Sequence, residues 1–272
     1  MDRGCTNRMW PLNFGALTLV TAIAVSGAVA PPAAAGGDPH ALKVCTTGDY
    51  PPLTYRDPAT GQYSGVDIDM ANDLAAHLGR QPVFVATTWP TLMADLTSPG
   101  MCDIAVGGIT DTPDRRRVAD ATSPYLASGK TPVVAPANAG RFSSIQDINQ
   151  PGVRVIENSG GTNEQFARKN FPDAQIAIWA DNTTIFDQLA AGNADVMVTD
   201  AVEAIYQSSL HPGLVAEHPE QPFTSEAKAY LLPNGSPIAG QTDSWLAGAL
   251  HDGTFAGIYQ RWLHTPVPEA PQ

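Results

Sequence analysis

The stretch DIDMANDLAAHL, residues 67–78, follows a short apolar run at Leu42–Thr46 and precedes another at Val83–Thr87. Its apolar side chains recur at the spacing of one helix face: Ile68, Ala71, Leu74, Ala75 and Leu78. Gly79, directly after this run, is typical of a helix end. A helix between two short strands forms a βαβ unit, so the sequence predicts an α/β fold with parallel strands.

The alternation of strands and helices continues along the chain in two series. Pro90–Leu96 predicts a helix and Asp103–Gly107 a strand, and these complete the first series. The second series predicts three strands and three helices: Val153–Ile156, Thr162–Phe171, Ile176–Trp179, Thr183–Ala191, Asp195–Val198 and Ala201–Leu210. Thr162 and Gln165 match a capping-box pattern at the start of its first helix.

Two extended runs, Thr131–Pro136 and Ala229–Pro233, bracket the second series and are expected to carry the chain between two lobes. We therefore predict lobe 1 from residues 40–132 and 233–265, and lobe 2 from residues 133–232. Each lobe is expected to hold a mostly parallel sheet flanked by helices. A ligand cleft is expected between the lobes, where binding sites commonly form.

The N-terminal residues have the pattern of a cleavable export signal. Arg3 and Arg8 precede an apolar stretch at Leu12–Ala28, and small residues follow up to Ala35. We predict that residues 1–35 are removed, with an approximate cleavage position, and that the mature chain is periplasmic or secreted. The apolar stretch is short for a membrane anchor, so no membrane attachment is expected after cleavage.

The balance of charge narrows the class of partner. The 272 residues carry a formal net charge of −12, and removal of Asp2, Arg3 and Arg8 with the signal changes this to −13. Such an excess of negative charge argues against nucleic acid and anionic membranes as partners. It leaves a small-molecule anion open, because a cleft can be locally cationic.

Cys45 and Cys102 are the two cysteines outside the predicted signal. In an oxidising compartment they either form a disulfide or remain buried thiols, and the sequence leaves both open. No histidine lies at metal-ligand spacing from them, so we expect no metal site. Phosphate-loop, dinucleotide and nucleophile-elbow motifs are missing as well.

The segment GGITDTPDR, residues 107–115, ends a predicted strand and enters a turn or helix. Free N–H groups at Gly108, the Thr110 hydroxyl and the Arg115 guanidinium would together suit a carboxylate. The alternative is that Arg115 begins a solvated basic run with Arg116 and Arg117.

Four runs in this sequence resemble the bacterial solute-binding proteins for polar amino acids: GITDTPDR at 108–115, SPY at 123–125, YPPL at 50–53 and GVDIDM at 65–70. The resemblance covers nearly all of residues 42–263 and implies the two-lobed, type II periplasmic-binding-protein fold. It implies that Arg115 and Thr110 hold a ligand α-carboxylate, that Asp200 holds the α-ammonium, and that Tyr50 lines the ligand.

Further runs resemble one enzyme group within that family, the cyclohexadienyl dehydratases: TTGDY at 46–50, TWPTLM at 88–93, SGKTP at 128–132, GGTNEQFA at 160–167, VTDAVEA at 198–204, HPEQPF at 218–223 and KAYLLP at 228–233. This resemblance implies conversion of prephenate to phenylpyruvate and of arogenate to phenylalanine. It implies that Glu203 is the general acid and that Asn158 lies close to the reacting group. Aromatisation drives the reaction, so no cofactor is expected.

Glu203 also has a structural interpretation, since Asp200 and Glu203 fit the acidic form of a capping box. A helix start would lower the pKa of Glu203, which is unfavourable for an acid. An alternative function is therefore a solute-binding protein of an importer for amino acids. The sequence does not decide between a monomer and a homo-oligomer.

The remaining candidates are residues that could contact a dianionic ring substrate. Lys130 is expected to bind a second carboxylate, and Lys228 is a weaker candidate for the same role. Trp89 could stack on the ring, although a core tryptophan is nearly as well supported. Thr162 and Asn163 could donate to a carboxylate, and their alternative role is helix capping.

Overall fold

The computed structural model describes residue 38 and residues 40–268. The predicted export signal, residues 1–35, lies outside the described residues. In the part of the chain that is described, none of the helices is long and apolar enough to cross a membrane.

The first sheet has five strands in the order β5-β1-β6-β15-β7. Their bounds are β1 (Ala41–Thr46), β5 (Gln81–Ala86), β6 (Ile104–Ala105), β7 (Ala119–Ala121) and β15 (Leu231–Pro233). Strand β1 pairs in parallel with β5 and β6, as the βαβ pattern predicted. Strand β15 arrives from the far end of the chain and pairs antiparallel with both β6 and β7. A small antiparallel sheet of three strands precedes the first helix: β2 (Asp49–Tyr50), β3 (Thr54–Arg56) and β4 (Tyr63–Ser64).

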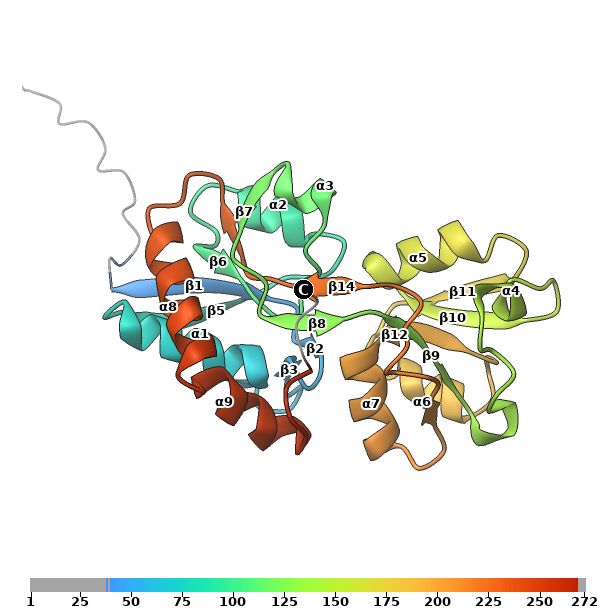
Figure 1. The fold of residues 1–272 in the computed structure, drawn as a ribbon. Helices are drawn as coiled ribbons and strands as arrows, with labels where there is room; N and C mark the ends of the chain where they lie inside the picture. Colours follow the sequence, from blue (N-terminus) through green and yellow to red (C-terminus); the bar gives the residue numbers. More distant parts are fainter. Residues whose placement is uncertain (1–37, 39, 269–272) are drawn as a thin grey trace, which may run out of the picture. The chain divides into compact units, whose positions relative to one another are not determined.

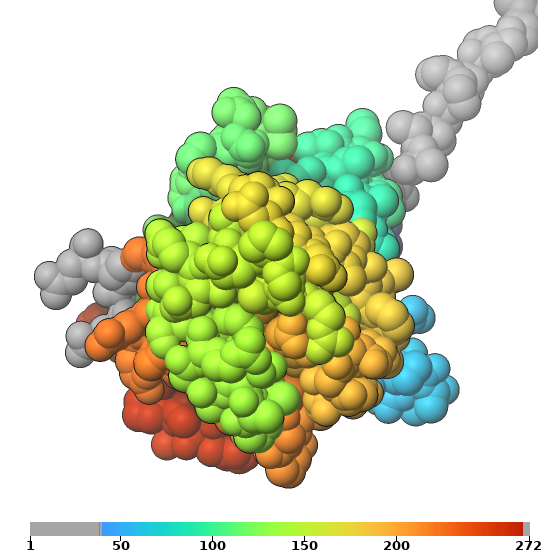
Figure 2. All heavy atoms as spheres, turned by 90° about the vertical axis from the view of Figure 1, so that its right-hand side faces the viewer, coloured from blue at the N-terminus to red at the C-terminus, as the bar shows by residue number. Residues whose placement is uncertain are grey.

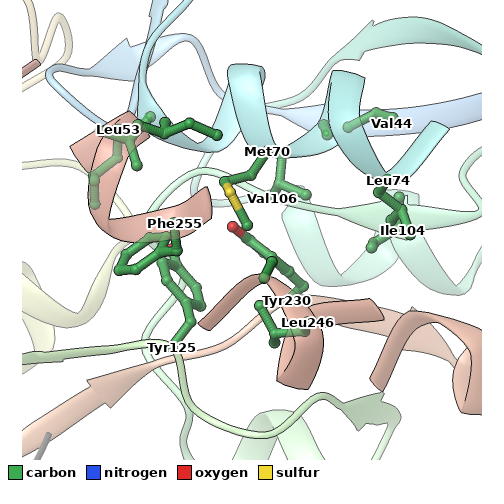
Figure 3. Packing of buried hydrophobic residues seen from close by; sticks show 14 of the residues in the cluster. Val44, Leu53, Met70, Leu74, Ile104, Val106, Tyr125, Tyr230, Leu246 and Phe255 are labelled. Atoms are coloured by element: carbon green, nitrogen blue, oxygen red, sulfur yellow. The ribbon is translucent and has the colours of Figure 1, made fainter. Parts of the chain in front are cut away.

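Five helices accompany this sheet: α1 (Val66–His77), α2 (Leu92–Thr97), α3 (Pro113–Arg116), α8 (Ala239–His251) and α9 (Thr254–Leu263). Helix α1 lies against α8 and α9, so the C-terminal helices complete the part of the fold that the N-terminal strands begin (Figure 1). Met70 and Leu74 of α1 pack in one apolar cluster with Val106, Tyr230 and Phe255 (Figure 3). The predicted helix face is therefore the buried one.

The structure joins Cys45 and Cys102 in a disulfide, with their Cα atoms 5.7 Å apart. This distance lies within the range that a disulfide requires. Of the two interpretations that the sequence left open, the structure supports the disulfide. The bond ties β1 to the segment just before β6.

The second series of strands forms two groups. In the first, β10 (Arg154–Asn158) and β11 (Gln175–Trp179) pair in parallel. In the second, β9 (Lys130–Val134) lies between β12 (Met197–Asp200) and β13 (Val215–Ala216), and both of its pairings are antiparallel. A parallel bridge between Val155 and Val196 links the two groups.

Helices α4 (Ile145–Ile148), α5 (Thr162–Asn170), α6 (Ile185–Ala190) and α7 (Ala201–Leu210) accompany these strands, together with a 3₁₀ turn at Pro136–Asn138. Figure 2 shows the face on which residues from about 130 to 200 gather. The capping box predicted at Thr162 and Gln165 is wrong. Gly161 is the N-cap residue of α5, and no side chain caps that helix.

Strands β8 (Leu126–Ser128) and β14 (Glu226–Lys228) pair antiparallel where the chain leaves the first sheet and returns to it (Figure 1). They precede β9 and β15, which hold most of the two extended runs predicted as crossings. Antiparallel pairing follows from this path, because the outgoing and returning segments run side by side in opposite directions. The residue numbers proposed for the lobe boundaries stay a prediction.

Candidate active site

A small cavity with about 270 Å³ of empty space lies among residues from both series of strands. Its lining residues are Tyr50, Trp89, Gly108, Thr110, Asn158, Gly161, Thr162, Asn163, Asn182 and Asp200. All but Gly161 and Asn182 were candidates from the sequence. The structure therefore brings together in one place eight candidates that are spread over 150 residues of sequence.

Strand ends and helix starts position these side chains. Tyr50 ends β2, Asn158 ends β10 and Asp200 ends β12. Thr162 and Asn163 form the first turn of α5. Binding residues gather at such places in α/β folds, because the carboxyl ends of strands leave side chains and backbone groups facing a crevice.

Position 108 at the cavity wall requires glycine for steric reasons. Its φ of +70° is unfavourable for other residues, and a Cβ atom there would lie 2.3 Å from Cε1 of Tyr50. The expectation that its N–H is free for a ligand is wrong. The N–H groups of Gly107 and Gly108 donate to Oδ2 of Asp67, at 3.1 and 2.7 Å.

Asp67 is fully buried and also accepts hydrogen bonds from the hydroxyls of Tyr125 and Tyr230. Burial raises its pKa to about 6, although these hydrogen bonds oppose the effect. Its role is to fix the glycine turn beneath the cavity. These two N–H groups are therefore not available to an anion in the cavity.

Arg115 faces inward, while its two neighbours remain at the surface. Its Nη1 donates to the carbonyl oxygen of Thr110 at 2.7 Å, and the side chain is partly buried. Arg116 pairs with Asp111, and Arg117 pairs with Asp114. The solvated basic run therefore comprises Arg116 and Arg117. Arg115 does not line the cavity itself but lies beside Thr110, which does.

Asp200 is the centre of a buried ion cluster. Its Oδ1 accepts from Nζ of Lys130 at 2.9 Å, and its Oδ2 accepts from Nζ of Lys228 and the hydroxyl of Tyr50, each at 2.6 Å. Burial alone would raise the pKa of Asp200. Lys130 and Lys228 outweigh burial and hold the pKa below its ordinary value, so this carboxylate is ionised.

Each of the two lysines also bonds to a threonine that lines the cavity. Lys130 also donates to the Thr162 hydroxyl at 2.9 Å and to Oδ1 of Asn163 at 2.5 Å. Lys228 donates to the Thr110 hydroxyl at 2.8 Å. Both lysine side chains are completely buried. Thr162 thus contacts a lysine rather than capping α5.

Glu203 lies one helical turn beyond Asp200 and is completely buried, but it does not line the cavity. The Thr199 hydroxyl donates to its Oε2, and Oε1 has no hydrogen-bond partner among the described residues. Burial, more than any other cause, raises the pKa of Glu203 well above its ordinary value, and the nearby Asp200 and Asp49 carboxylates add to the effect. Both causes favour the protonated form of this carboxyl group.

The capping-box interpretation of Asp200 and Glu203 is wrong. Asp200 is the N-cap residue of α7, but its side chain makes no capping hydrogen bond. Its carboxylate is engaged by the lysines and Tyr50 instead. The spacing that suggested a cap therefore places a carboxyl group with a lowered pKa one helical turn before a carboxyl group with a raised pKa.

Asn158 and Trp89 complete the candidates. Oδ1 of Asn158 accepts from Nδ2 of Asn163 at 3.1 Å. The Trp89 ring meets the Tyr50 ring edge to face, with centroids 5.8 Å apart. An aromatic pair at the wall of the cavity suits contact with a planar ring.

Sequence reasoning missed Asn182 and Thr199 and underrated Lys228. Asn182 donates to the carbonyl oxygen of Asp49 at 2.8 Å, and nothing in its local sequence indicates this long-range contact. Thr199 could have been suspected, since it directly precedes Asp200 at a strand end. The described residues hold no group of His, Cys, Asp and Glu side chains suited to a metal ion.

Comparison with known proteins places the chain in a family. Residues 42–265 match the model of the bacterial extracellular solute-binding proteins, family 3, and the chain belongs to this family. Among curated proteins, the chain is 46% identical over 229 residues to cyclohexadienyl dehydratase of Pseudomonas aeruginosa, covering 84% of this chain and 85% of that protein.

Two solved structures of ancestral proteins are similar to this chain. One is an ancestral amino acid-binding protein described as a precursor of cyclohexadienyl dehydratase, with a TM-score of 0.76 and 36% identity over 82% of this chain and 96% of that one. The other is an ancestral cyclohexadienyl dehydratase, with a TM-score of 0.51 and 48% identity over 83% of this chain and 93% of that one.

Proposed function

We propose that this protein is an exported cyclohexadienyl dehydratase that converts prephenate to phenylpyruvate and arogenate to phenylalanine. In this reaction the Glu203 carboxyl group gives its proton to the ring hydroxyl as the carbon–oxygen bond breaks. The bond to the ring carboxylate breaks as well, and its electron pair completes the aromatic ring. Water and carbon dioxide leave, and the Glu203 carboxylate regains a proton from solvent.

The observation that carries the proposal is the buried carboxyl group of Glu203, whose pKa is raised and which lies one helical turn beyond the cavity-lining Asp200. A general acid must hold its proton at working pH, and burial with neighbouring negative charge is the usual way for a protein to achieve this. A side chain that served only to cap a helix would be ionised and would face the helix N–H groups. In Glu203, by contrast, burial raises the pKa, and Oε2 accepts from the Thr199 hydroxyl.

The cationic side chains suit a substrate with two carboxylates. Lys130, Lys228 and Arg115 supply three basic side chains around the cavity, against the acidic side chains of Asp200 and Glu226. Glu226 lies 3.7 Å from Lys130 and offsets part of its charge. The remaining positive charge favours an anion, and the Arg115 guanidinium can hold a carboxylate through two hydrogen bonds.

The state of Asp200 argues against the amino-acid importer as the function. An aspartate that binds an α-ammonium needs free acceptor positions, but Lys130, Lys228 and Tyr50 already fill three of the roughly four positions that the Asp200 carboxylate offers. The groups around it are donors, which suit the keto oxygen of prephenate better than the ammonium of arogenate. We therefore expect a larger kcat/KM for prephenate than for arogenate.

Roles for the other lining residues follow from their contacts. Trp89 and Tyr50 contact the substrate ring, Thr110 and Thr162 contact its carboxylates, and Asn158 lies beside the reacting ring carbon. Export by a cleaved signal would place the reaction in the periplasm or outside the cell. The product would then be a precursor of phenylalanine or phenylalanine itself.

The test is to mix purified mature protein with prephenate and to follow phenylpyruvate by its ultraviolet absorbance in alkali. Turnover well above the rate of the spontaneous reaction supports the proposal. No turnover, together with tight binding of an amino acid in calorimetry, would favour the importer instead.

A further inference from the structure

A chain of buried hydrogen bonds connects Lys130 to Glu203 through two intermediate side chains. Nζ of Lys130 donates to Oδ1 of Asn163, and Nδ2 of Asn163 donates to the Thr199 hydroxyl oxygen at 3.0 Å. The Thr199 hydroxyl in turn donates to Oε2 of Glu203. At most 6% of any of these four residues is exposed, so water does not compete with these bonds.

The direction of each bond in this chain follows from the first. A lysine ammonium has three donors and no acceptor. The Asn163 atom that faces Lys130 must therefore be the amide oxygen. This turns the amide NH₂ toward Thr199 and toward Oδ1 of Asn158, which accepts from it at 3.1 Å.

Thr199 transmits the same direction to Glu203. Its hydroxyl carries a single hydrogen, and its oxygen already accepts from Asn163. The hydrogen is therefore directed at Oε2 of Glu203. An oxygen that accepts this bond is the carbonyl-like oxygen of a neutral carboxyl group, so the acidic proton lies on Oε1. Within the described residues, Oε1 has no other partner to take that proton.

We propose that Thr199 is a positioning residue that keeps the acidic proton of Glu203 on Oε1, where the substrate hydroxyl can receive it. Asn163 and the charge of Lys130 fix the direction of the Thr199 hydroxyl. This inference rests on the proposed dehydratase function, since it assigns a role in proton transfer. Thr199 itself does not touch the substrate.

The test compares Thr199→Val with Thr199→Ser. Valine keeps the shape and strand preference of threonine and removes the hydroxyl, whereas serine keeps the hydroxyl. Thr199→Val is expected to lower kcat about tenfold with little change in KM, in line with the loss of one well-placed hydrogen bond. Thr199→Ser is expected to retain kcat within about threefold, because the donor to Glu203 remains.

The pH profile separates positioning from a merely structural role. The Thr199 hydrogen bond lowers the pKa of Glu203, so its loss raises that pKa further. The alkaline fall in kcat of Thr199→Val is therefore expected at higher pH than in the wild type. A loosened fold would reduce activity without moving this limb.

Asn163→Asp gives a second route if Thr199→Val does not fold. A carboxylate at 163 would accept the Thr199 hydrogen and turn it away from Glu203. This variant should lower kcat by about the factor expected of Thr199→Val and should move the alkaline limb to higher pH, because the hydrogen bond that lowers the pKa of Glu203 is lost. A folded Asn163→Asp protein with the kcat and pH profile of the wild type would overturn the proposal.

The outcomes distinguish this inference from the proposed function. If the wild-type protein does not turn over prephenate, the dehydratase function fails and the role of Thr199 fails with it. If the wild-type protein is active and Thr199→Val matches it in kcat and pH profile, only the role of Thr199 is overturned.

Discussion

Replacement of Glu203 by glutamine separates its chemical role from its structural one. Glutamine has the same shape, its side-chain oxygen can accept from Thr199, and its NH₂ can still donate a hydrogen bond. It has no acidic proton to give. General acid catalysis typically contributes about 10²–10⁴-fold, so kcat is expected to fall by that factor while KM changes only a few-fold.

The same change is expected to stabilise the fold above neutral pH. Burial raises the pKa of Glu203 well above 4.5, its ordinary value. An acid whose pKa is higher in the folded protein stabilises the fold fully at pH values below its pKa in the unfolded chain. This stability is lost as the pH rises toward its pKa in the folded protein, because the group ionises first in the unfolded chain. At pH 7.5, about three units above the ordinary pKa, the loss is at most about 4 kcal/mol at 1.36 kcal/mol per unit. Glutamine does not titrate and avoids this loss.

The assay measures phenylpyruvate formation and urea unfolding of both proteins at pH 5 and pH 8. From pH 5 to pH 8, the unfolding free energy of Glu203→Gln should increase relative to that of the wild type. The turnover of the variant should be low at both pH values. A folded variant with near wild-type kcat would refute the catalytic assignment. Equal pH dependence of stability in both proteins would refute the buried, protonated state.

Three further changes test other parts of the site and fold. Arg115→Ala should reduce kcat/KM by at least about 30-fold, since loss of a charged partner typically costs about 2–5 kcal/mol, and an unchanged value would remove Arg115 from substrate binding. Lys228→Met should raise the kcat/KM for arogenate relative to that for prephenate, because the change frees an acceptor position on Asp200 for an ammonium group. Both substrates have the same two carboxylates, so weaker carboxylate binding would affect both alike. An unchanged ratio would therefore contradict the role of Asp200. Reduction of the Cys45–Cys102 bond, which spans 57 residues, should lower unfolding stability by up to about 4 kcal/mol and raise the intact mass by two hydrogens, whereas two free thiols in untreated exported protein would contradict the disulfide.

Periodic patterns predicted the regular elements well. The predicted helix at Ala201–Leu210 has the observed bounds of α7, and the helix predicted at residues 67–78 differs from α1 by one residue at each end. Such helices are predictable because burial of one face repeats along the chain. The extended run predicted at Ala229–Pro233 was less accurate, because β14 ends at Lys228 and pairs with β8, whereas β15 begins only at Leu231 and pairs with β6 and β7.

Partners of polar side chains were much harder to predict. Thr162 and Gln165 have the spacing of a capping box, yet Thr162 accepts from Lys130, which is 32 residues away. Likewise, the N–H of Gly108 was expected to be free, but it donates a hydrogen bond to the Asp67 carboxylate. Local spacing identifies what a side chain can do, and the choice between local and distant partners depends on tertiary structure.

Asp200 and Glu203 show how one cluster of charges can give two carboxyl groups opposite states. Lys130 and Lys228 lie against Asp200 and keep it ionised despite its burial. Within the part of the chain that the structure describes, no lysine bonds to Glu203, and the negative charge of Asp200 raises its pKa in addition to burial. Two carboxyl groups whose environments drive their pKa values apart are the usual mark of an acid with a charged neighbour. Lys130 therefore acts on Glu203 in two ways: its charge lowers the pKa of Glu203 directly, whereas the charge that both lysines fix on Asp200 raises it and helps to keep the proton on the group that must donate it.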